Sequence, residues 1–125
     1  MNENELSRII FDLGLKVHRV LGPGLLESAY EECLYYELCM LNLKVEKQKA
    51  LPLVYEDVRL DAGYRIDLLV ENKLVIEVKS VEALNDLHMA QILTYLQLSG
   101  CKLGLLINFN TLLFKEGVRR VVNGL

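Results

Sequence analysis

The sequence predicts an α/β or α+β fold in which helices flank a central mixed β-sheet. Three observations support this prediction. The N-terminal third shows helical periodicity, short segments of alternating character follow it, and a further helical stretch leads into an apolar run at residues 102–109. At 125 residues, of which 52% are hydrophobic and 25% charged, the chain suits one soluble globular domain spanning residues 1–125.

Two helices are expected first. Apolar residues recur at spacings of three, four and seven over residues 2–21, and Asn2 with Glu5 resembles a capping box at the start of this helix. Gly22-Pro23-Gly24 ends it. The proline of that break suits the first turn of a second helix over residues 24–41.

The rest of the chain is predicted to hold strands and one more helix. Glu56-Asp57 is a turn signal between two short strands, and Gly100 is a candidate cap for the third helix. The apolar run at 102–109 indicates a strand buried on both faces, often parallel to its neighbour after a helical crossover. The expected strands span residues 44–50, 53–55, 58–60, 63–70, 74–80, 102–109 and 118–122, and the third helix spans residues 84–99.

The hairpin over residues 63–80 carries charges where a plain core strand would have none. If Glu71-Asn72-Lys73 is a three-residue loop, Asp67 lies directly opposite Glu77, and Lys79 shares the face of Glu77. A two-residue loop would instead put the two carboxylates on opposite faces. Like charges side by side destabilise a strand pair, so a cation is expected near them.

These three residue types suit a divalent metal site. Mg²⁺ prefers oxygen ligands and usually takes one or two carboxylates together with water and phosphate. Such an ion activates water and neutralises a phosphodiester, and Lys79 on the same face would stabilise the transition state. The alternative is that Lys79 merely pairs with Asp67 and Glu77 on a solvent-facing strand.

Two helices carry further candidate residues. His88, Gln91 and Tyr95 share one face of the third helix and would border the carboxylates if that helix covers the sheet. Glu27 is another carboxylate, just after the Gly-Pro-Gly break. The alternatives are an exposed polar face for the third helix and a glutamate that stabilises the start of the second helix.

Three motifs in order carry a resemblance to a known family. Gly24-Leu25-Leu26-Glu27-Ser28-Ala29-Tyr30 matches the signature of the GxxExxY protein family. Gly63-Tyr64-Arg65-Ile66-Asp67, followed by Glu77-Val78-Lys79, resembles the core motif of the PD-(D/E)XK nuclease superfamily. Gln91-Ile92-Leu93-Thr94-Tyr95 is similar to the QxxxY element of its RecB-like branch. The resemblance covers essentially the whole chain.

The resemblance implies a restriction-endonuclease-like core with an extra N-terminal helix. It also implies a nuclease that uses Mg²⁺ or Mn²⁺ and acts on DNA or RNA. Asp67 and Glu77 would be metal ligands, with the Val78 carbonyl as a further ligand, and Glu27 would bind the metal directly or through water. Lys79 would be the catalytic lysine, with Gln91 and Tyr95 assisting it.

Composition argues against several other classes of protein. The net charge of −3 argues against binding nucleic acid through bulk positive charge. Cys33, Cys39 and Cys101 lack metal-ligand spacing and are expected to be reduced core thiols of a cytoplasmic protein. No secretory signal is visible and no apolar run approaches the ~20 residues of a membrane span, so no membrane partner is expected.

A second function class stays open. A nuclease fold can serve as a catalytically silent module that binds a protein or nucleic-acid partner. The aliphatic first helix and the C-terminal segment offer a homodimer surface for such a module.

Overall fold

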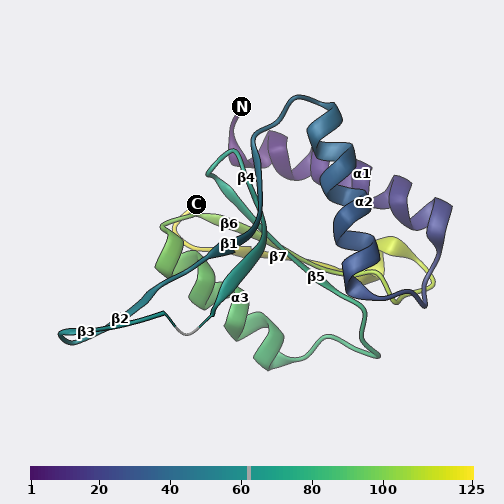
Figure 1. Ribbon diagram of the computed structural model, residues 1–125. Coiled ribbons are helices and arrows are strands. Elements are labelled where there is room, and N and C mark those ends of the chain that lie inside the picture. Colours follow the sequence, from purple (N-terminus) through teal and green to yellow (C-terminus); the bar gives the residue numbers. More distant parts are fainter. Residues whose placement is uncertain (62) are drawn as a thin grey trace.

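The structure is a computed structural model that describes residues 1–61 and 63–125 (Figure 1). A five-stranded mixed sheet of order β1-β4-β5-β6-β7 lies between helices, so the predicted α/β architecture is confirmed. The helices are α1 (Glu3–Leu21), α2 (Glu27–Met40), α3 (Asp86–Ser99) and the short 3-10 helix η1 (Phe114–Gly117). The strands are β1 (Val45–Ala50), β2 (Leu53–Tyr55), β3 (Val58–Leu60), β4 (Arg65–Val70), β5 (Leu74–Lys79), β6 (Leu103–Asn108) and β7 (Val118–Val122).

Two hydrophobic cores hold the layers together. α1 and α2 pack on one face of the sheet, where Leu6, Tyr30 and Leu34 meet alternate residues of β4, β5 and β6. α3 covers the other face, with Ile92 and Leu96 against the sheet. Figure 1 shows the sheet between these two helical layers. Because successive strand residues point to opposite faces, the sheet needs apolar residues on both sides.

The crossover from β5 through α3 to β6 follows the prediction. β5 and β6 are parallel and all six residues of β6 are buried. Gly100 caps α3 in the left-handed conformation at a φ of 78°. Gly104 lets α3 approach β6 closely, since a Cβ at this position would lie 2.9 Å from Ile92 Cδ1.

β2 and β3 do not join the main sheet. They form a separate two-stranded ribbon that projects away from the body of the molecule (Figure 1). Val54 and Tyr55 in this ribbon are 64% and 68% exposed. At its base, Leu51 N donates to Tyr64 O at 2.8 Å. The ribbon is therefore an insertion between β1 and β4.

Some expected details differ from the structure. α2 begins at Glu27 instead of residue 24, because Gly22 and Gly24 adopt positive φ values of 68° and 100° and keep the segment out of a helix. Leu87, an apolar residue in the first turn of α3, is 79% exposed. Cys39 is exposed, so it is not a core thiol.

Within residues 1–61 and 63–125, no helix has the length and apolar character to cross a bilayer.

Candidate active site

The β4–β5 hairpin has the predicted three-residue loop. Val70 pairs with Leu74, and the same register continues to Leu68 and Ile76. Its next step puts Asp67 opposite Glu77, as parity requires. The loop uses left-handed conformations at two residues, Glu71 and Asn72, with φ values of 53° and 54°.

At Asp67 and Glu77 the carboxylates take part in hydrogen bonding between the strands. Asp67 N donates to Glu77 Oε2 at 2.8 Å, and Val78 N donates to Asp67 Oδ2 at 2.8 Å. The regular pairing of the two strands ends at Leu68 and Ile76. Each strand therefore ties its carboxylate to the backbone of the other, which orients both side chains.

Burial disfavours the ionised form of both carboxyl groups. Glu77 is only 4% exposed, and burial together with the charge of Asp67 raises the pKa of Glu77 to about 8. Burial also raises the pKa of Asp67, against the hydrogen bond from Val78 N. The Lys79 charge opposes the rise at both carboxyls. A site with this electrostatic character favours a bound cation.

Lys79 ends β5 and is half-buried. In the described part of the chain it forms no ion pair, so a simple pairing with Asp67 and Glu77 does not account for it. The segment after it is fastened by buried Asn108, whose side chain accepts from Val81 N at 3.1 Å and donates to Val81 O at 3.0 Å. Lys79 therefore stands at a fixed strand end.

Glu27 is the first residue of α2 and reaches the same strand end. Its Oε1 accepts from Ser80 N at 3.3 Å, and the Ser80 hydroxyl donates to Leu25 O at 2.6 Å. The charge of Glu27 also contributes to the raised pKa of Asp67. The structure thus brings Glu27 beside the residue that follows Lys79.

Gln91 and Tyr95 belong to α3, which covers the face of the sheet opposite to α1 and α2. Gln91 Nε2 donates to Tyr95 Oη at 3.2 Å. Burial raises the pKa of Tyr95, and the charges of Glu77 and Asp67 raise it further. His88 has another role, because it completes a capping box with Asn85 at the start of α3.

A comparison with protein-family models finds one that matches residues 4–121, described as the PD-(D/E)XK nuclease superfamily. The chain belongs to this superfamily. No curated protein and no solved structure gives a significant match. The match covers nearly the whole chain and both helical layers, so the restriction-endonuclease-like resemblance is confirmed at the level of the superfamily.

Two residues at this PD-(D/E)XK hairpin were missed by the sequence analysis. Gln48 of β1 donates to Asp67 Oδ1 at 3.2 Å, and also to Glu31 of α2 at 2.9 Å. Burial raises the pKa of Glu31. Glu31 follows Glu27 by one helical turn, which is a usable signal for a shared face. Gln48 has no such signal, because its position depends on the pairing of β1 with β4.

Members of the PD-(D/E)XK superfamily generally use divalent metals. Among the residues that the structure describes, no three His, Cys, Asp or Glu side chains gather into a ready metal-binding group. The donors present are two carboxylates, each with one oxygen engaged by backbone. This donor set fits Mg²⁺ or Mn²⁺, since such ions bind through one or two carboxylates and complete their shell with water and phosphate.

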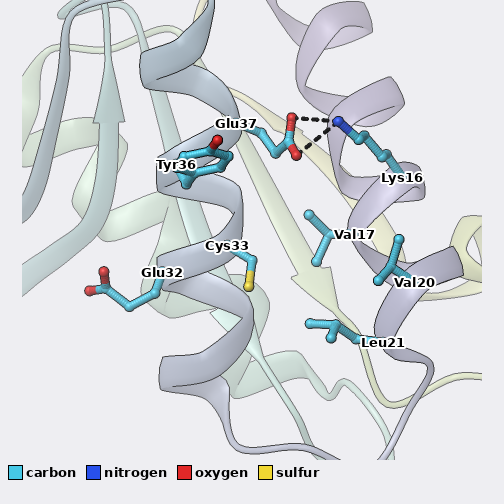
Figure 2. A pocket seen from close by; sticks show the side chains of 8 residues that line it. All are labelled: Lys16, Val17, Val20, Leu21, Glu32, Cys33, Tyr36 and Glu37. Carbon is cyan, nitrogen blue, oxygen red and sulfur yellow. Dashed lines mark hydrogen bonds and ion pairs between the residues drawn. The ribbon is translucent and has the colours of Figure 1, made fainter.

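A cavity of about 260 Å³ lies elsewhere, between α1 and α2 (Figure 2). Its floor is apolar, with Val17, Leu21 and Cys33 turned toward one another, and an ion pair of Lys16 with Glu37 at 2.9 Å closes one end. None of the residues predicted for the PD-(D/E)XK site lines it. The cavity therefore forms no part of the candidate active site.

Proposed function

We propose that this chain is a metal-dependent nuclease that hydrolyses phosphodiester bonds of DNA or RNA. The proposal rests on one observation within the superfamily fold: Asp67 and Glu77 lie opposite each other at the end of the hairpin, with Lys79 following on the same strand. The buried carboxyl of Glu77 beside the half-buried carboxyl of Asp67 favours a cation that neutralises both, and phosphodiester hydrolysis uses one.

The proposed roles follow from position. Asp67 and Glu77 hold Mg²⁺ or Mn²⁺, and Glu27 contributes a ligand from the start of α2, directly or through water. When bound, such an ion supplies charge neutralisation at the phosphate and a more acidic water. Lys79 places its ammonium where negative charge develops on the phosphate oxygens. Gln91 and Tyr95 assist from α3.

A catalytically silent module is the second candidate. Lys47 and Lys49, two basic residues of β1, pair with Glu32 and Glu46 on the protein itself. Paired lysines offer less to a phosphate backbone than free ones. This favours a fold that binds a partner protein or a small region of nucleic acid through surfaces other than β1.

Metal binding provides the first test. Asp67→Asn and Glu77→Gln each keep an oxygen that accepts the backbone hydrogen bond but remove the charge. We expect isothermal titration calorimetry to show Mn²⁺ affinity reduced by at least about tenfold in both variants. Asp57→Asn, on the exposed ribbon, serves as the control with unchanged affinity. Equal affinity in all four proteins would rule out the proposed site.

Cleavage provides the second test. Single-stranded, double-stranded and branched DNA and RNA are incubated with the wild type and with Lys79→Ala in Mg²⁺. We expect cleavage by the wild type and a loss on the order of 100-fold or more in the variant. Cleavage that survives Lys79→Ala would point to another site or to a contaminant. Metal binding without cleavage of any substrate would favour the silent module.

A further inference from the structure

One amide group sits among three carboxylate oxygens beside the hairpin. Gln48 Nε2 lies 2.9 Å and 3.1 Å from the two oxygens of Glu31 and 3.2 Å from Asp67 Oδ1. Glu31 belongs to α2 and Asp67 to β4, so the amide links a helix to the sheet. A neutral group with two N–H bonds thus occupies the space between two acidic side chains.

The Asp67 oxygen that Gln48 holds is the one that a cation would need. Asp67 Oδ2 is already committed to Val78 N at 2.8 Å. Oδ1 therefore remains the better oxygen for a metal, and its partner in this structure is Gln48. A cation that binds Oδ1 must compete with the amide.

The backbone at Gln48 is unusual for its position. Its φ is 55°, a left-handed conformation that costs a residue other than glycine free energy. The β1–β4 register is the same on either side, from Lys47 opposite Leu68 to Lys49 opposite Ile66. The strained residue therefore adds no extra residue to the strand, and it stands opposite Asp67.

We propose that Gln48 is a placeholder for the metal: its amide holds Asp67 and Glu31 together in the metal-free chain and withdraws from Asp67 when a divalent cation binds. This rests on the proposed function, which puts the cation at Asp67. Gln48 is a positioning residue that lowers metal affinity while it stabilises the empty site. If Gln48 were a metal ligand, it would raise metal affinity. If it were purely structural, it would leave metal affinity unchanged.

The test is Mn²⁺ affinity measured by calorimetry in two variants of opposite expected effect. Gln48→Gly removes the amide and also relieves the left-handed backbone, so folding is not at risk from strain. We expect it to bind Mn²⁺ about tenfold more tightly, because the ion no longer displaces hydrogen bonds to charged groups. Gln48→Lys places a permanent charge between the carboxylates, and we expect it to bind Mn²⁺ at least about tenfold more weakly.

Thermal melting of the metal-free proteins gives a second readout. Gln48→Lys is expected to melt above the wild type, because its ammonium pairs with both carboxylates. Gln97→Ala, an exposed glutamine of α3, is the matched control and should change neither measurement. Mn²⁺ affinity that is unchanged or weaker in Gln48→Gly overturns the placeholder role, and so does unchanged affinity in Gln48→Lys.

The outcomes separate this inference from the proposed function. Tighter Mn²⁺ binding by Gln48→Gly supports the placeholder even if no nucleic acid is cleaved, whereas the absence of cleavage counts only against the nuclease. If cleavage depends on Lys79 but Gln48→Gly binds Mn²⁺ with unchanged affinity, only the placeholder role is rejected. If neither the wild type nor Gln48→Gly binds Mn²⁺, the placeholder is rejected with the metal site.

Discussion

At the scale of single residues, Tyr30 determines where Glu27 stands. Its hydroxyl donates to Gly22 O at 2.5 Å and accepts from Leu25 N at 3.1 Å, which holds the loop before α2. Gly24 in that loop has a φ of 100°, which favours glycine. The glycine, glutamate and tyrosine of this motif thus have one physical purpose, which is to present Glu27 at the start of the helix.

Tyr30→Phe tests this role. The ring stacks on Phe109 with centroids 4.5 Å apart, and phenylalanine preserves that contact. The lost hydroxyl leaves Gly22 O and Leu25 N without their partner, so we expect the free energy of unfolding in urea to fall by about 1–3 kcal/mol. Tyr36→Phe, at an exposed position, is the control. Equal stability of wild type and Tyr30→Phe would show that water replaces the hydroxyl at no cost.

At the scale of elements, the β2–β3 ribbon is separable from the fold. None of its residues belongs to either hydrophobic core, and the bond from Leu51 N to Tyr64 O closes its base. We expect replacement of residues 53–60 by a short Gly-Ser linker to change the free energy of unfolding by less than about 1 kcal/mol. Circular dichroism during chemical unfolding checks this. A loss of several kcal/mol would mean that the ribbon supports the sheet.

Element by element, sequence reasoning succeeded where a periodic pattern was tied to one geometry. The parity of Asp67 and Glu77 depended only on the length of the loop between them, and the burial of β6 on its unbroken apolar run. Sequence reasoning failed where the pairing of distant strands determines which residues are neighbours. Residues on the two sides of the ribbon are far apart in sequence, so nothing local places Gln48 opposite Asp67. Similarly, the apolar side chain of Leu87 gave no sign that the first turn of α3 is exposed.

At the scale of the whole molecule, the buried carboxyl of Glu77 makes stability depend on pH. Its pKa is about 8 in the folded chain, against an ordinary value of 4.5. Between these values the folded chain holds a proton that the unfolded chain has released. The contribution of Glu77 is therefore fully favourable below pH 4.5 and is lost as the pH rises toward 8.

We expect the metal-free wild type, kept in chelator, to lose stability across this window, by at most about 1.4 kcal/mol per pH unit from this group. Burial also raises the pKa of Asp67, so Asp67 adds to this loss of stability as the pH rises. Glu77→Gln cannot release a proton, so its unfolding free energy should fall much less between pH 5 and 8. Urea unfolding at several pH values measures both proteins, and parallel curves would contradict the assigned burial.

The end of the β4–β5 hairpin, where the regular pairing stops, has a consequence for the sheet itself. Peptide groups do not titrate in the ordinary pH range and, when paired with each other across strands, do not bind cations, so most strand pairs are indifferent to pH and to dissolved metal ions. Here the last hydrogen bonds between the two strands run from Asp67 N and Val78 N to side-chain carboxylates, which do both. The hydrogen bonding between these two central strands therefore depends on pH and on bound cations. What occupies the carboxylates decides how firmly the sheet is closed at that end.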